Sequence, residues 1–255
     1  MINVLRVDIR RYLMTKTFVF LVFIISVILP VLMRLIMLGL SAFMHKADAL
    51  VMVEFSTYSS MADIYIAVFV TMFLHAEAGE GIIRNKLISG KKRYEIFISY
   101  CMVNAALAVI LQGISVLVTG LMGVCTGAIF EVTFSEIMRY TLVSILAGIA
   151  ISVLYTSVYL CFCTCKAAIV MPACVAIFMR ILLVFIEDAI YTSSGIPKVT
   201  GITLKLYEGF DRYVSFAHLT GELRWDNASY LIGNLIMIVI SMLVGVLVFR
   251  KKDMK

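Results

Sequence analysis

The chain has 255 residues, of which 62% are apolar and only 15% are charged. Soluble domains are about 45–50% apolar and about 25% charged, so the composition excludes an ordinary soluble domain and predicts an integral membrane protein. The apolar residues form blocks long enough for membrane-spanning helices, which need about 20 residues, rather than the short alternating strands of membrane barrels. The net charge of +6 comes from basic loops on one side of the membrane and does not indicate a nucleic-acid partner.

The first segment, residues 1–17, has the pattern of a short amphipathic helix. Its apolar residues recur at helical spacing and its arginines fall on a different stripe: Ile2, Leu5, Ile9 and Leu13 against Arg6 and Arg10. Such a helix would lie on the inner membrane surface with its cations facing lipid phosphates. The alternative is an ordinary positively charged flank of the first span.

Six apolar blocks follow, and each predicts one membrane-spanning helix: 18–40, 58–76, 96–125, 142–165, 167–187 and 230–249. Pro30 predicts a kink in the first helix, which neighbouring helices can tolerate. The third block is too long for an upright span, so we expect it to tilt strongly or to project from the membrane. The predicted fold class is therefore an all-α integral membrane protein, with one membrane domain over residues 1–255.

Lysine and arginine are concentrated on one side of these helices. Fourteen of the 22 lie in the N-terminal segment, the second-to-third loop, the fourth-to-fifth junction and the tail, and six lie in the loops of the opposite side. Basic loops stay in the cytoplasm, so we expect a multi-pass protein of the plasma membrane, in a bacterial cell, with both termini cytoplasmic.

The segment 188–229 is the only sizeable loop on the external side. It combines acidic residues with aromatic ones: Asp188, Glu208, Asp211, Glu222 and Asp226 with Tyr191, Tyr207, Phe210, Tyr213, Phe216 and Trp225. Aromatic rings are enriched at membrane interfaces, so we expect short external or re-entrant helices here, before the last span.

The loop 77–94 is the most distinctive segment of the sequence. Two acidic residues open it, apolar and basic residues alternate through its centre, and Gly90 ends the helical pattern before a basic run. A helix of two to three turns across the inner face would suit docking into a groove of a partner. The alternative is a positively charged turn that only fixes the topology.

This loop resembles the signature of type-2 ATP-binding-cassette (ABC) transporter permeases. The resemblance is carried by Phe73, Glu77, Gly81, Arg84, Leu87 and the run Gly90, Lys91, Lys92 and Arg93. The layout is similar too: about 250 residues, six spans, an amphipathic N-terminal helix, and an aromatic-basic end at Phe249-Arg250-Lys251-Lys252-Asp253.

The resemblance implies a membrane-spanning subunit of an exporter, driven by a separate nucleotide-binding ATPase subunit that carries ATP and Mg. The residues that would couple to that ATPase are Glu77, Gly81, Arg84, Leu87, Gly90 and Arg93. The chain has no P-loop of its own, because Gly90-Lys91 is followed by Lys92 rather than by Ser or Thr. The family further implies a second permease copy or homologue in the lipid bilayer, and as cargo a peptide such as an antimicrobial peptide, an antibiotic or another amphipathic or hydrophobic compound.

Three ionisable residues fall inside predicted spans: Arg34, Asp63 and Arg180. Charged groups in a membrane are costly and are functional candidates for that reason. One hypothesis is that Arg34 and Asp63 pair across neighbouring helices and hold the outer ends closed. The alternative is that these side chains snorkel to the outer headgroups.

Other functions find less support in the residues. A membrane metalloprotease needs His and Glu at helical spacing, but no second intramembrane His accompanies His75, and Cys161, Cys163 and Cys165 do not share one helix face. We therefore expect no enzyme activity, metal or cofactor in this chain. A secondary transporter should carry midplane carboxylates, whereas the acids here lie near span ends. A secondary transporter and a non-transporting sensor or assembly subunit remain the alternatives.

Overall fold

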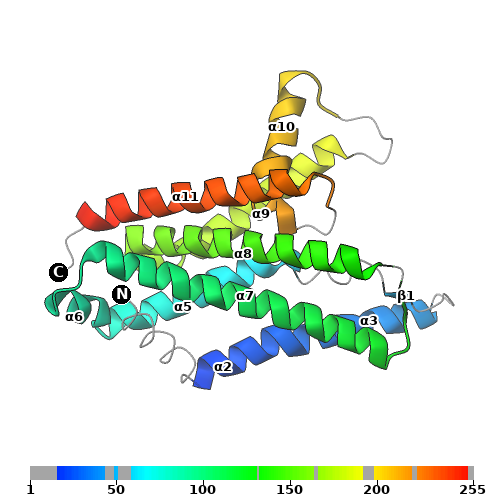
Figure 1. The fold of residues 1–255 in the computed structure, drawn as a ribbon, viewed down its shortest axis with the longest axis horizontal. Helices are drawn as coiled ribbons and strands as arrows, with labels where there is room; N and C mark the ends of the chain where they lie inside the picture. Colours follow the sequence, from blue (N-terminus) through cyan, green and yellow to red (C-terminus); the bar gives the residue numbers. More distant parts are fainter. Residues whose placement is uncertain are drawn as a thin grey trace.

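The computed structural model describes residues 16–43, 49–50, 59–130, 132–163, 166–191, 198–219 and 223–251, which form an elongated helical bundle (Figure 1). Within this described part, four helices are long and apolar enough to cross a membrane: α5 (Ala62–Gly79), α7 (Arg93–Cys125), α8 (Phe134–Phe162) and α11 (Asn227–Lys251). They confirm the predicted helical fold class and are compatible with a membrane protein. Two additional helical segments correspond to the first and fifth predicted spans.

The first predicted span forms one helical path in three parts: α2 (Lys16–Phe23), the π-helical turn η1 (Ile24–Ile28) and α3 (Leu29–Phe43). Pro30 lies directly after the π turn and has no N–H, and its ring would clash with the carbonyl one α-helical turn earlier. The wider turn, in which the Leu29 N–H bonds to the Ile24 carbonyl, relieves this clash. The kink predicted at Pro30 therefore takes the form of a π-helical insertion.

The fifth predicted span corresponds to α9 (Met171–Ile190), which follows a short 3-10 turn, η2 (Lys166–Ile169). Pro172 lies in the first turn of α9. Backbone N–H groups in the first turn of a helix have no partner within the helix, so a proline there costs no hydrogen bond. The boundary between the fourth and fifth spans thus lies near the predicted place.

Two long helices form the middle of the bundle. α7 has 33 residues and is about 50 Å long, longer than the roughly 30 Å apolar core of a bilayer, as the sequence predicted. α8 packs against α5, α7, α9 and α11 and so occupies the centre (Figure 1). It begins at Phe134 rather than at the predicted residue 142, because Thr133 and Glu136 form a capping box that starts the helix outside the apolar block.

The helices approach closely where small residues face one another. A Cβ added to Gly245 of α11 would lie 2.4 Å from the Phe97 ring of α7 and 2.7 Å from the Ser157 hydroxyl of α8. Ser157 Oγ also donates to the Ser241 carbonyl at 2.9 Å. A second polar contact between helices is made by Asn104 of α7, whose Nδ2 donates to Thr156 Oγ1 of α8 at 2.8 Å.

The loop 188–229 contains α10 (Ile202–Tyr213) and η3 (Ala217–Leu219), so the predicted short helices before the last span are present. α10 projects from one end of the bundle (Figure 1). At the same end, β1 (Ala49–Leu50) and β2 (Ile129–Phe130) pair in parallel over two residues each.

Part of the sequence predictions falls outside the described residues. The amphipathic helix predicted over 1–17 lies almost wholly in residues 1–15, which the structure does not describe. The same holds for Cys165 and for residues 252–255 of the basic tail. The amphipathic N-terminal helix and the basic tail therefore stay predictions.

Candidate functional site

The segment singled out by sequence forms a short helix, α6 (Ile82–Ile88), between the ends of α5 and α7. Gly81 and Gly90 flank it with φ of 67° and 81°, in the left-handed region that glycine adopts without strain. Nothing lies within 4 Å of a Cβ built on either glycine, so the backbone conformation rather than space requires them. The glycines of the predicted signature thus turn the chain into and out of α6, at the same end of the bundle as the end of α11 (Figure 1).

A buried ionic cluster fixes α6 to its neighbours. Lys86 Nζ of α6 lies 2.9 Å from Glu77 Oε2 of α5, and the Tyr100 hydroxyl of α7 donates to the same oxygen at 2.9 Å. Lys86 also lies 3.0 Å from the Tyr100 oxygen and 4.4 Å from the centre of its ring. The Glu77 side chain is only 2% exposed, so its carboxylate holds the loop together inside the protein.

The sequence identified Glu77 but not Lys86 or Tyr100. Lys86 looks like one more cation of a basic loop, and Tyr100 lies two turns into an apolar helix. No local spacing pattern joins the three. Their meeting depends on the turn at Gly81, which folds α6 back towards α5 and α7.

Arg93 connects the start of α7 to the end of α11. Its Nη1 donates to the carbonyls of Phe249 and Arg250 at 3.3 and 3.5 Å, where a helix end has unpaired carbonyls and a partial negative charge. The rings of Phe97 and Phe249 lie 6.4 Å apart just inside the same contact. Arg93 therefore ties the predicted coupling loop to the last helix.

The other residues of α6 divide between two faces. Ile83 is buried and Leu87 packs against the core, whereas Arg84 and Ile88 are exposed, the latter to 73%. The open face of α6 is thus part basic and part apolar. Ile88 belongs to this face and was not among the predicted site residues.

The ion pair observed between the predicted spans is not the predicted pair of Arg34 with Asp63. Asp63 of α5 pairs with Arg180 of α9 at 3.2 Å, and not with Arg34. Arg34 is 1% exposed and its Nη2 donates to the Thr126 hydroxyl, after the end of α7, at 2.9 Å. The reason is the helix order: α5 packs against α9, while α3 packs against α7.

The opposite end of the bundle carries a cap of aromatic and charged residues. Asp211 Oδ2 accepts from the Tyr191 hydroxyl at 2.8 Å and from Trp225 Nε1 at 2.9 Å. Tyr191 and Trp225, two of the aromatic residues of the loop 188–229, thus bind the carboxylate of Asp211, a residue that is 5% exposed.

His218 belongs to the same cap. Its Nε2 donates to the Arg212 carbonyl at 3.1 Å, and its Nδ1 lies 3.3 Å from the side-chain amide of Asn234. The ring packs edge-on against Tyr230, with 4.7 Å between ring centres. Burial lowers the pKa of His218, although the contacts with Arg212 and Asn234 and the negative charge of Asp211 oppose the shift.

Among the described residues, no group of three or more His, Cys, Asp or Glu side chains lies close enough together to hold a metal ion. The two prominent features are the α6 region at one end and the ion pair of Asp63 with Arg180 inside the bundle. No protein-family model matches the chain, and no protein of curated function matches it.

Proposed function

We propose that this chain is the six-span membrane subunit of an ABC exporter, and that α6 receives the movement of a separate ATPase subunit. The exporter would move a peptide, an antibiotic or another amphipathic compound out of a bacterial cell, with both termini of the chain in the cytoplasm. A second copy or a homologue would complete the translocation path. The observation that carries the proposal is that α6 combines an open basic and apolar face with close contacts to the two long helices α5 and α7.

The contacts give a route for force from α6 into the bundle. Lys86 and Glu77 join α6 to α5, Tyr100 joins both to α7, and Arg93 joins α7 to the end of α11. A partner that displaces α6 therefore displaces three long helices together. Energy from ATP would enter as a shift in the populations of inward-open and outward-open states.

The test is co-purification of the tagged chain from its host in mild detergent, followed by identification of a stoichiometric P-loop ATPase. Arg84→Glu reverses the charge of the open face and should remove the ATPase. Lys205→Glu is the matched control, because Lys205 is exposed on α10 at the other end of the bundle. Loss with Arg84→Glu alone supports the proposal; absence of an ATPase from the wild-type preparation refutes it.

One observation favours a second candidate function, a secondary transporter. Asp63 is 2% exposed and is paired with Arg180 inside the helical bundle, and intramembrane ion pairs mark proton and ion pathways in transporters. Such a protein would move its substrate in proteoliposomes under an ion gradient without any ATPase. In a secondary transporter, Asp63→Asn would abolish this gradient-driven transport. An ABC exporter would show no gradient-driven transport even as the wild type.

A further inference from the structure

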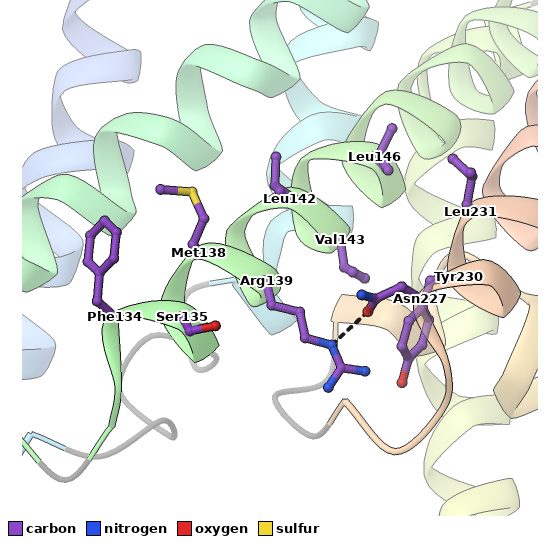
Figure 2. A pocket seen from close by; sticks show the side chains of 10 residues that line it. All are labelled: Phe134, Ser135, Met138, Arg139, Leu142, Val143, Leu146, Asn227, Tyr230 and Leu231. Carbon is purple, nitrogen blue, oxygen red and sulfur yellow. Dashed lines mark hydrogen bonds between the residues drawn. The ribbon is translucent and has the colours of Figure 1, made fainter.

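A groove with a volume of about 620 Å³ runs between the first half of α8 and the start of α11 (Figure 2). It lies at the end of the bundle opposite α6 (Figure 1). Its apolar lining comes chiefly from Phe134, Met138, Leu142, Leu146, Tyr230 and Leu231. Several of these side chains are largely exposed, among them Phe134 and Leu142, so the groove opens onto the surface of the bundle. Its volume is within the range of about 300–1,000 Å³ that is usual for ligand sites.

One cation stands at the edge of this apolar groove. Arg139 reaches from α8 towards the start of α11 (Figure 2), where its Nε donates to Asn227 Oδ1 at 2.7 Å and its Nη2 to the Trp225 carbonyl at 2.8 Å. Both acceptors are neutral, so they orient the guanidinium without balancing its charge. Glu136, one turn earlier, is held by Thr133 in the capping box, and no described carboxylate pairs with Arg139.

The dimensions of the groove match one leaflet of a bilayer. The lining residues of α8 run from Phe134 to Leu146, a distance of about 18 Å at about 1.5 Å per helical residue. Half of the roughly 30 Å hydrocarbon core is about 15 Å. Arg139 lies part-way along this lining, and from it the apolar lining of α8 continues for about 10 Å to Leu146. An oriented cation with an apolar channel leading away from it fits a ligand with an anionic head and an apolar chain.

We propose that this groove binds an anionic phospholipid, with its phosphate on Arg139 and one acyl chain along Met138, Leu142 and Leu146. The inference rests on the membrane location and is independent of the proposed transporter function. A peptide in the groove would leave backbone N–H groups without partners along apolar walls. A helix from a second copy of the chain would bury the Arg139 charge without an anion.

The test is native mass spectrometry of the purified full chain, titrated with phosphatidylglycerol and, in parallel, with phosphatidylcholine. Arg139→Gln should weaken the tightest phosphatidylglycerol site about tenfold, equivalent to about 1.4 kcal/mol, and leave phosphatidylcholine binding unchanged. Lys205→Gln, which removes an exposed cation of α10 outside the groove, is the charge control and should bind phosphatidylglycerol like the wild type.

A second pair of variants tests the acyl-chain channel without changing charge. Leu142→Trp fills the groove and should also weaken the tightest phosphatidylglycerol site, whereas Leu117→Trp on the exposed surface of α7 should not. Retention of wild-type phosphatidylglycerol binding by both Arg139→Gln and Leu142→Trp would overturn the inference. So would a dimer of the chain that Leu142→Trp disrupts while lipid binding is unaffected, because the groove would then be an interface between copies.

Discussion

The cluster that holds α6 gives the sharpest quantitative prediction. Lys86→Met removes the cation that lies 2.9 Å from a Glu77 carboxylate that is 2% exposed. The carboxylate then keeps the Tyr100 hydroxyl but loses the ammonium group of α6 from a buried site. Breaking a buried ion pair by removal of one partner costs about 3–5 kcal/mol. We therefore expect Lys86→Met to lower the free energy of unfolding by about that amount, since Lys86 itself is only 13% exposed.

The matched experiment is a double-mutant cycle measured by denaturant unfolding in one detergent. Glu77→Gln in the Lys86→Met background removes the buried negative charge and keeps an oxygen for Tyr100, so the double variant should be more stable than Lys86→Met alone. The expected coupling between the two sites is within the range of about 0.5–3 kcal/mol that is found for contacting residues. Additive effects of the two changes would refute a stabilising role for the ion pair.

Three further predictions concern other contacts. Gly245→Ala should destabilise the protein by about 1–3 kcal/mol in the same assay, because its Cβ would meet the Phe97 ring at 2.4 Å; Gly113→Ala, whose Cβ would meet nothing within 4 Å, should not. Arg93→Gln should speed amide hydrogen exchange in the last turn of α11, whose carbonyls it binds, and the exposed-neighbour control Lys92→Gln should not. His218 is buried with a lowered pKa, so the unfolded chain takes up its proton more readily. Stability should be full above the ordinary pKa of about 6.5 and decline as the pH falls below it, and His218→Asn should flatten this decline.

Most of the helices could be predicted from the sequence because the length of an apolar block is a local property. The start of α8 was missed for an equally local reason. Thr133 and Glu136 form a capping box in a stretch that is not apolar enough to belong to a span. A search for the spacing of Ser or Thr with Glu before an apolar block would have found it.

The partners of the charged residues could not be predicted, because they depend on which helices become neighbours. Arg34 and Asp63 belong to consecutive spans, and consecutive spans are a reasonable first guess for a contact. In the structure Asp63 meets Arg180, more than a hundred residues away along the chain. The partner of Lys86 could not be predicted either, although it lies nearby in the sequence. The turn at Gly81, which has a positive φ, brings Lys86 to Glu77, and no residue spacing indicates this contact.

Helix α11 runs from the groove to the α6 end of the molecule. The proposed lipid site and the proposed ATPase site could therefore influence each other through α11, and this can be tested. Arg93 binds the last carbonyls of α11 beside α6, while Asn227 and Leu231 in its first turns line the groove near Arg139. α11 has 25 residues and is about 38 Å long, and it packs along α8. A displacement of α6 passed on by α11 would therefore change the shape of the groove.

Coupling between two binding sites is reciprocal: if the lipid changes the affinity for the ATPase by some factor, the ATPase changes the affinity for the lipid by the same factor. We expect phosphatidylglycerol to change the affinity of the chain for the proposed ATPase, and Arg139→Gln to remove that dependence while the ATPase still binds. Arg93→Gln should weaken the dependence as well, because it loosens α11 from the start of α7. An ATPase affinity that is equal with and without phosphatidylglycerol would show that the two ends act independently, even if each binds its own partner.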